Sequence, residues 1–256
     1  IKGTIIISSE GINGSISFLK KDLNKIKIKI KKIFKISKFD NENSVLTKFV
    51  PFKKGRIKLK KEVVPIGKKL KHRVKNNHLS PDQWNKFILR KDSFIIDTRK
   101  EFEFKIGTFK NSINPQINNF RDFSKYFRKY KKNSKIGMFC TGGIRCEKAS
   151  DYLKSKGYTN IFQLKGGIIN YLSKIDKKKS LWKGECFVFD NRVSVNHNLK
   201  SGKYSICAGC REPISFKDKN SSKFEEGVSC PSCYDKSTES QKSRFRMRQS
   251  QIYKTK

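Results

Sequence analysis

A cysteine that begins a glycine-rich run carries the strongest chemical signal in the sequence. The run is Cys140-Thr141-Gly142-Gly143-Ile144-Arg145-Cys146, and an apolar stretch at 136–139 leads into it. A thiol reacts as a nucleophile near neutral pH only when its pKa is lowered, and backbone N–H groups, a helix amino terminus and a cation each lower it. The two glycines let the backbone fold around the sulfur, so the four residues after Cys140 form an anion nest for a thiolate or persulfide. We predict a reactive thiol here rather than a structural cysteine at a strand end.

Arg145 and Cys146 are the two residues of this run that could assist the thiol. We place Arg145 among the catalytic residues, because its charge could support a thiolate or hold a substrate phosphate. A surface salt bridge at the start of the following helix is the alternative. Cys146 could be a resolving thiol, since reactive cysteines are often paired with a neighbour during thiol oxidation. It could also be a small residue packed under the first helical turn, and we slightly favour this structural role.

Four more cysteines form two closely spaced pairs near the carboxyl terminus. They are Cys207, Cys210, Cys230 and Cys233. The pattern Cys-x2-Cys, 19 residues, Cys-x2-Cys is typical of a tetrahedral structural zinc site. Such a site would fold a segment that is poor in apolar residues. Two redox pairs are the alternative, and the three scattered histidines indicate no iron site.

The residues around Cys140 alternate between predicted strands and helices. Short apolar strands are predicted at 94–97, 136–139 and 161–164. Ser80 followed by Pro81 is a good helix start, and the helix after the cysteine run should end at Gly157. This alternation predicts an α/β fold with a central parallel sheet over residues 79–176. Active groups of such sheets lie beyond the carboxyl ends of the strands, where Cys140 falls.

Residues 1–66 predict a separate α+β unit. It begins with a strand, a turn at 8–14 and a second strand, and a helix follows at 20–34 with apolar residues at helical spacing. An alternating stretch at 57–64 predicts a further strand. Residues 177–256, which begin with three lysines, form a cysteine-rich carboxyl-terminal region that ends in a basic tail.

The formal net charge of +38 indicates a polyanionic partner, with RNA as the first candidate. Lysine supplies most of this charge in a chain that is also rich in isoleucine and asparagine. A bias toward AT-rich codons is therefore an equally good explanation for much of it. Lysines at 20–35 and in the 68–75 linker could follow phosphates. In the tail, the candidate RNA-binding residues are Arg244, Phe245, Arg246, Arg248 and Tyr253.

The apolar stretches and the number of cysteines further limit the class of protein. No apolar stretch approaches the length of roughly 18 residues that a membrane helix needs. The seven cysteines are an odd number with paired spacing, which favours thiol and metal chemistry in a reducing compartment over a disulfide framework. We therefore expect a cytoplasmic protein with no membrane partner.

Several motifs around the cysteine run resemble those of rhodanese domains. Asp97-Thr98-Arg99 resembles their opening signature, and Gly157-Tyr158 with Gly166-Gly167 resembles their closing one. The active loop of sulfurtransferase rhodaneses spans six residues from the cysteine, which 140–145 match. Related phosphatases use Cys-x5-Arg, a larger loop sized for phosphate, whereas the spacing here is Cys-x4-Arg. The resemblance therefore argues against a phosphatase, and we expect Asp97 and Arg99 to be a buried framework pair.

Three motifs in a fixed order make the resemblance narrower. They are Glu10-Gly11-Ile12-Asn13-Gly14, the run from Cys140 to Glu147, and the segment from Trp182 to Asp190. Together they resemble the bacterial oxygen-dependent tRNA uridine(34) hydroxylase family over nearly the whole chain.

This resemblance implies a ferredoxin-like first domain, a central rhodanese domain and a zinc-ribbon-like carboxyl-terminal segment. It also implies hydroxylation of the wobble uridine in the tRNA anticodon loop to 5-hydroxyuridine, with molecular oxygen as co-substrate and Cys140 as the essential thiol. The family's first strand and helix should precede Ile1, so we expect a truncated first domain.

Two other functions stay open from the sequence. The first is a sulfurtransferase that carries a persulfide on Cys140. The second is a basic, zinc-containing RNA-binding module whose cysteine loop has lost its activity. The residues do not indicate the electron donor of a hydroxylation, the set of tRNAs or the oligomeric state.

Overall fold

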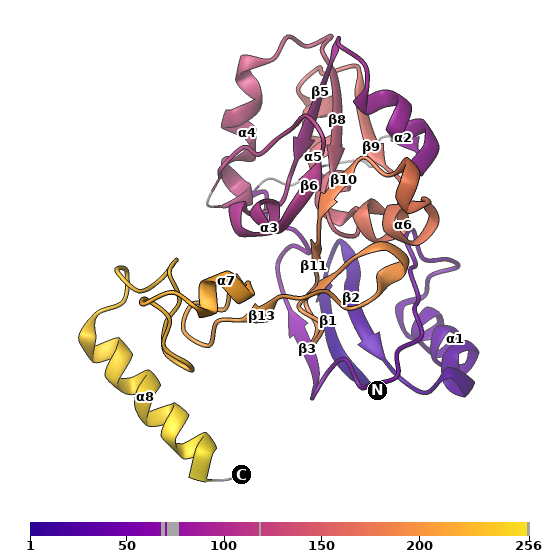
Figure 1. Cartoon of the computed structure of the whole chain (residues 1–256). Coiled ribbons are helices and arrows are strands. Elements are labelled where there is room, and N and C mark those ends of the chain that lie inside the picture. Colours follow the sequence, from indigo (N-terminus) through magenta and orange to yellow (C-terminus); the bar gives the residue numbers. More distant parts are fainter. Residues whose placement is uncertain (68–69, 71–76, 118, 255–256) are drawn as a thin grey trace.

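A five-stranded parallel sheet forms the centre of the molecule (Figure 1). The computed structural model describes residues 1–67, 70, 77–117 and 119–254. Every pairing in the central sheet is parallel, as predicted from the alternating pattern. In spatial order its strands are β4 (Asn77–Leu79), β9 (Ile161–Leu164), β8 (Lys135–Phe139), β5 (Ser93–Asp97) and β7 (Ser112–Ile113).

Helices cover both faces of this sheet (Figure 1). One apolar cluster includes residues of α2 (Pro81–Ile88) and α6 (Gly167–Lys174), and the other includes residues of α4 (Phe123–Tyr126) and α5 (Ile144–Ser155). The predicted start of α2 is confirmed, because Ser80 and Gln83 form a reciprocal capping box. Short 3-10 turns lie at Lys20–Asp22, Phe120–Asp122, Phe127–Lys129, Lys177–Lys179 and His197–Leu199.

The apolar core of the central sheet continues past residue 176. β10 (Trp182–Gly184) pairs antiparallel with β6 (Gly107–Phe109), and the Trp182 ring packs edge-on against Phe109 at 5.0 Å. β11 (Cys186–Phe187) and β12 (Ser194–Val195) form a small hairpin whose Cys186 and Val195 side chains join the same cluster. This segment therefore packs on the sheet rather than on the carboxyl-terminal cysteines.

The amino-terminal unit is a three-stranded sheet with one helix, α1 (Leu23–Phe34). β1 (Lys2–Ser8) lies in the middle, antiparallel to β2 (Gly11–Ser17) and parallel to β3 (Gly55–Leu59). The predicted turn at 8–14 was too long, since only two residues turn and Gly14 faces Ile5 in the ladder. A Cβ at Gly14 would lie 2.3 Å from the Thr4 carbonyl oxygen, so this glycine serves close strand approach instead.

The third predicted strand, 57–64, is also shorter than expected. It ends at Leu59, because the Glu62 carboxylate accepts hydrogen bonds from the backbone N–H groups of Ile66 and Gly67 and so folds the chain into a turn. The predicted basic linker at 68–75 lies outside the described residues apart from residue 70.

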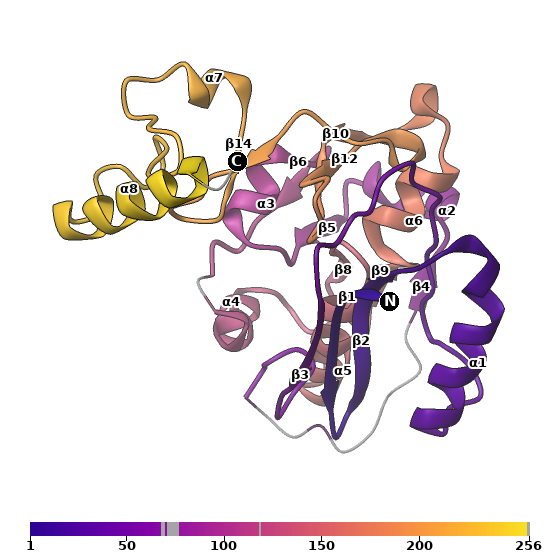
Figure 2. The same ribbon diagram turned by 90° about the horizontal axis from the view of Figure 1, so that it is seen from below.

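The carboxyl-terminal part extends away from the central sheet and ends in a long helix (Figures 1 and 2). It contains β13 (Ser205–Ile206), β14 (Pro213–Ile214), α7 (Phe216–Lys219) and α8 (Glu239–Lys254). The segment expected as a basic tail is thus a helix of 16 residues. Among the described residues, none of the helices is both long and apolar enough to cross a membrane.

In the central unit, α3 (Glu101–Ile106) connects the Asp97-Thr98-Arg99 motif to β6.

Candidate functional site

Cys140 is the first residue after β8 and lies at the carboxyl end of the parallel sheet, as predicted. Its side chain is buried, and the backbone N–H of Gly143 donates a hydrogen bond to its Sγ at 3.1 Å. The start of α6 also stabilises the loop, because the backbone N–H of Ile168 donates a hydrogen bond to the Cys140 carbonyl oxygen at 3.0 Å. Gly167 has φ +67°, and a Cβ there would lie 2.6 Å from that oxygen. Only glycine fits at this close approach.

The surroundings of Cys140 favour its thiolate. Burial alone would raise the pKa of Cys140, but a hydrogen bond from the Cys146 thiol, the positive charge of Arg145 and the backbone N–H groups of both residues lower it. The resulting pKa is about 6. Cys140 is therefore mostly ionised near neutral pH, which is the state that a nucleophilic thiol requires.

Arg145 is held in a buried ion pair with a carboxylate that the sequence analysis did not select. Its guanidinium donates to the two oxygens of Glu103 at 2.7 and 2.9 Å and to Thr141 Oγ1 at 3.3 Å. The side chain of Glu103 is 1% exposed and that of Arg145 is 18% exposed. Burial opposes ionisation of Glu103, yet the charge of Arg145 keeps its pKa below the usual range. This pair is therefore not a surface salt bridge, and it fixes the cation beside the cysteine loop.

Cys146 lies in the first turn of α5, buried beside the Cys140 thiol. Its Sγ is 3.5 Å from Thr98 Oγ1, and this hydroxyl donates to the Phe139 carbonyl oxygen at 3.0 Å. Burial and the nearby Cys140 raise the pKa of Cys146 well above its ordinary value. Cys146 thus stays protonated and can donate its S–H to the thiolate. The closeness of the two thiols fits both roles considered for Cys146, packing under the first helical turn and acting as the resolving thiol for Cys140.

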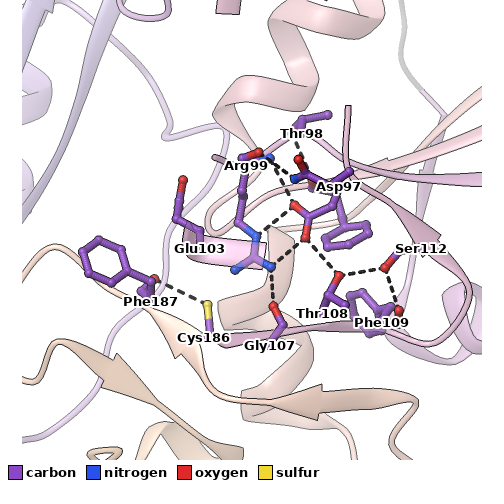
Figure 3. Close-up of polar contacts among 12 residues, drawn as sticks. Asp97, Thr98, Arg99, Glu103, Gly107, Thr108, Phe109, Ser112, Cys186 and Phe187 are labelled. Carbon is purple, nitrogen blue, oxygen red and sulfur yellow. Dashed lines mark hydrogen bonds and ion pairs between the residues drawn. The ribbon is translucent and has the colours of Figure 1, made fainter. Parts of the chain in front are cut away.

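Asp97 and Arg99 form the expected framework pair beneath the site (Figure 3). The Arg99 guanidinium donates to both Asp97 oxygens at 2.9 and 2.7 Å and to the Gly107 carbonyl oxygen at 2.6 Å. Both side chains are fully buried. The pair joins the end of β5 to β6, so it orients α3, which carries Glu103 toward Arg145.

The amino-terminal unit reaches the active loop, which the sequence did not reveal. Lys148 of α5 forms ion pairs with Glu10, in the turn between β1 and β2, and with Glu62 at 3.5 Å. A Cβ placed on Gly143 would lie 3.4 Å from Asn41 Nδ2, so the chain after α1 lies beside the loop. The motif around Glu10 was recognised as a sequence signature, but its contact with α5 depends on tertiary structure.

The four carboxyl-terminal cysteines come together as predicted. Their sulfur atoms all lie within 4.8 Å of one another. Three of the separations are 3.9 Å (Cys207–Cys233), 3.7 Å (Cys210–Cys230) and 3.8 Å (Cys230–Cys233). A tetrahedron of sulfurs at the usual Zn–S distance of about 2.3 Å has edges of roughly 3.8 Å. The cluster therefore has the size that a four-coordinate zinc ion requires.

Two of the arginines predicted to bind RNA make contacts within the protein, and the side chain of Arg246 also stays 48% exposed. Arg248 donates to the carbonyl oxygens of Ala208 and Gly227, at 3.1 and 2.9 Å. Arg246 donates to both carboxylate oxygens of Glu225, at 2.6 and 2.7 Å. These contacts fix α8 against the cysteine loops. Arg244 is exposed, and no ion pair reaches it from the described part of the chain.

The charge of Arg145 predicts how the ionisation of Cys140 depends on pH. Because the pKa of Cys140 is lowered to about 6, the thiolate should form as pH rises through 6 and reach about 90% at pH 7. Arg145→Ala removes the cation and leaves Glu103 unpaired, and both changes raise the pKa of Cys140. If the pKa of Cys140 rises by one unit, the fraction of thiolate at pH 6 falls roughly fivefold. Ultraviolet thiolate difference spectra against Cys140→Ser measure it, with Arg145→Lys as the charge-retaining control. An unchanged titration in Arg145→Ala would contradict this role of Arg145.

Comparison with known proteins agrees with this geometry. Residues 80–174 match the family model described as a rhodanese-like domain, and residues 1–63 match an acylphosphatase-like domain named UPF0176. A tRNA uridine(34) hydroxylase of Pelagibacter ubique is 58% identical over 253 residues, which are 98% of this chain and 84% of the relative.

Two solved structures match a smaller share of the chain. A rhodanese-related protein of Thermoplasma volcanium is 23% identical with a TM-score of 0.33, over 38% of this chain and 92% of that one. A single-domain sulfurtransferase of Saccharomyces cerevisiae is 19% identical with a TM-score of 0.35, over 40% and 94%. The relative that matches nearly the whole chain shows the family: the protein belongs to the tRNA uridine(34) hydroxylase family.

Proposed function

We propose that this protein is an oxidoreductase that hydroxylates the wobble uridine of tRNA to 5-hydroxyuridine, with molecular oxygen as co-substrate and Cys140 as the essential thiol. The observation that carries the proposal is the Cys140 thiolate, held by the Gly143 N–H at 3.1 Å at the end of the central sheet. The 58% identity to a protein named tRNA uridine(34) hydroxylase supports the choice of substrate.

The chemistry that suits this thiol is addition to the uracil ring. Attack of the Cys140 thiolate on C6 would form a carbon–sulfur bond and move electron density to C5, which becomes the carbon that reacts with oxygen. Loss of the C5 proton and departure of the thiolate then restore the ring. One oxygen atom stays on C5 and the other leaves as water, so a donor must supply two electrons and two protons.

The proposed partner is the anticodon loop, where the base to be modified is unpaired. A base must be unstacked before a buried group can reach it, and a single-stranded loop requires the least energy for this. The net charge of +38 supports a polyanionic partner. Seven free cysteines are consistent with a reducing compartment, so we place the enzyme in the cytoplasm.

We further propose that Cys207, Cys210, Cys230 and Cys233 hold one structural zinc ion. Three sulfur separations of 3.7 to 3.9 Å, with all four sulfurs within 4.8 Å of one another, support this choice. Three of the four cysteines are buried, and the small cluster around them contains few other apolar side chains, such as Ile214 and Phe224. A metal would therefore supply most of the stability of this segment.

A second candidate function is sulfur transfer, in which Cys140 carries a persulfide. The six-residue loop and its amide N–H groups favour it, since they would accept the extra sulfur as readily as a thiolate. Intact-mass analysis of the protein after incubation with thiosulfate distinguishes the two. A labile extra sulfur on Cys140 that is consumed during turnover would favour sulfur transfer, and its absence would favour hydroxylation.

The proposed function is tested by nucleoside mass spectrometry of tRNA. Cells that lack the endogenous hydroxylation activity should contain no 5-hydroxyuridine at the wobble position, and expression of this chain should restore it. Restoration by Cys186→Ser but not by Cys140→Ser is the expected pattern. No 5-hydroxyuridine in cells that express the wild-type chain would contradict the proposal.

A further inference from the structure

A hollow lies on the side of α3 that faces the carboxyl-terminal part of the chain. It is a cavity of about 380 Å³, within the range of roughly 300 to 1,000 Å³ that is common for small-molecule sites. Its lining residues come from α3, from the junction of β10 and β11, and from the chain before β13 and after β14. Those used in the argument are Ile106, Glu185, Lys203, Tyr204, Phe216 and Lys217. None of these residues takes part in the proposed chemistry at Cys140.

Two aromatic rings from different elements line this cavity. Phe216 is 77% exposed, although it is the first residue of α7 and is fixed there by the Ser215 capping box. Tyr204 is half-buried and packs with the apolar cluster that includes Ile106. An exposed ring on an ordered residue is a ready surface for stacking, and every nucleobase offers a flat face to it.

The charges around the cavity favour an anion. Lys203 and Lys217 are exposed, and no ion pair involves either one within residues 77–117 and 119–254. The single carboxylate of the lining, Glu185, is already bound, because it accepts hydrogen bonds from Ser194 Oγ at 2.6 Å and from the backbone N–H of Lys203 at 3.0 Å. Two lysines beside two rings match a base together with its flanking phosphates.

One short helix, α3, connects the cavity with the ion pair of the proposed active loop. Ile106 is the last residue of α3, and Glu103 of the same helix binds Arg145 at 2.7 Å. Three residues of an α-helix span only about 4.5 Å along its axis. Figure 1 also shows α7 and α3 on the same side of the molecule. A nucleotide strand bound at Cys140 could therefore extend directly over this cavity.

We infer that the cavity between α3 and α7 binds an unstacked base of the anticodon loop that flanks the reacting uridine, with Phe216 and Tyr204 stacking on the base and Lys203 and Lys217 contacting its phosphates. This inference rests on the proposed function for its partner. The site would hold the loop open and fix which nucleotide reaches Cys140. It assigns RNA recognition to the body of the molecule, at the helix that carries Glu103.

The role of the Phe216 ring is tested by equilibrium binding of tRNA to the full chain. Phe216→Ala should weaken binding by roughly 5- to 100-fold, the range expected for loss of one base–aromatic stack. Phe216→Tyr keeps the ring and should bind like the wild type, whereas Phe216→Leu keeps only the apolar volume and should behave like the alanine variant. Because the ring is exposed, these changes leave the core intact. Equal affinity of Phe216→Ala and wild type would overturn the inference.

The lysines are tested by the salt dependence of the same binding. Lys217→Ala should reduce the slope of log K against log salt by about one, the loss of one phosphate contact. The matched control is Lys91→Ala, an exposed lysine before the amino end of β5 and so at the opposite end of the sheet. An unchanged slope for Lys217→Ala, or an equal change in both variants, would contradict a phosphate contact at this cavity.

The two proposals fail in distinguishable ways. If the wild-type chain binds tRNA in a manner that depends on Phe216 but forms no 5-hydroxyuridine, the hydroxylase assignment fails and the base-binding site stands. If 5-hydroxyuridine forms normally and Phe216→Ala changes neither the affinity nor the KM for tRNA, the base-binding site fails and the hydroxylase assignment stands.

Discussion

Cys140→Ser should abolish 5-hydroxyuridine formation, with a loss of about a thousandfold or more, while the fold stays intact. A serine hydroxyl does not ionise near neutral pH, so no anion is available to attack the base. The oxygen can still accept the hydrogen bond that Gly143 donates to Cys140 Sγ. The side chains have nearly the same shape, and the site needs no repacking. Nucleoside mass spectrometry of tRNA from expressing cells measures the product, and the thermal unfolding midpoint checks the fold.

Cys186→Ser is the matched control for this experiment. Cys186 is as buried as Cys140, but burial raises its pKa to about 12. It therefore stays protonated, and its replacement should leave product formation within about threefold of the wild type. If Cys140→Ser kept its activity, or if both variants lost it equally with unchanged unfolding midpoints, the thiolate account of the site would be wrong.

Loss of the zinc site should unfold the carboxyl-terminal part selectively. Structural zinc binding in small domains provides about 10 to 16 kcal/mol at neutral pH, far more than the few apolar contacts around Ile214 can supply. Cys230→Ser removes a buried ligand, so the purified variant should contain no zinc. Limited proteolysis should then cleave within 205–254, where the wild type is protected. The central sheet should keep its unfolding midpoint, because its core contains none of these cysteines.

Metal analysis decides this prediction. The wild-type chain should contain one zinc ion per molecule, and a strong chelator should produce the same cleavage pattern as Cys230→Ser. Cys186→Ser should retain the metal, since this thiol lies in the core of the central unit. A metal-free wild-type protein that resists proteolysis over 205–254 would show that the cysteines stabilise this region without zinc.

Features set by local sequence were predictable. The parallel sheet followed from apolar segments separated by helical ones, and the position of Cys140 followed because strand ends of such sheets meet at one edge. The clustering of Cys207 and Cys210 with the second cysteine pair followed from spacing, which encodes ligand geometry directly. In each case residues close in the chain carried the information.

Features set by tertiary contacts were not predictable. Glu103 lies four residues after Arg99, but only its packing places it 2.7 Å from Arg145, 42 residues away. The arginines of α8 looked like RNA contacts because side-chain type alone does not show that Arg248 would meet the Gly227 carbonyl oxygen. The cavity at Phe216 combines residues from four segments, and no local pattern marks such a site.

Labelling with isotopically heavy oxygen gas tests the central claim most directly. Cells that lack the endogenous activity would express the chain under this gas in ordinary water, and their tRNA nucleosides would be analysed by mass spectrometry. The account predicts that the wobble 5-hydroxyuridine contains the heavy oxygen atom in cells with the wild-type chain and is absent in cells with Cys140→Ser. Product whose oxygen comes from water, or labelled product in the Cys140→Ser cells, would contradict it.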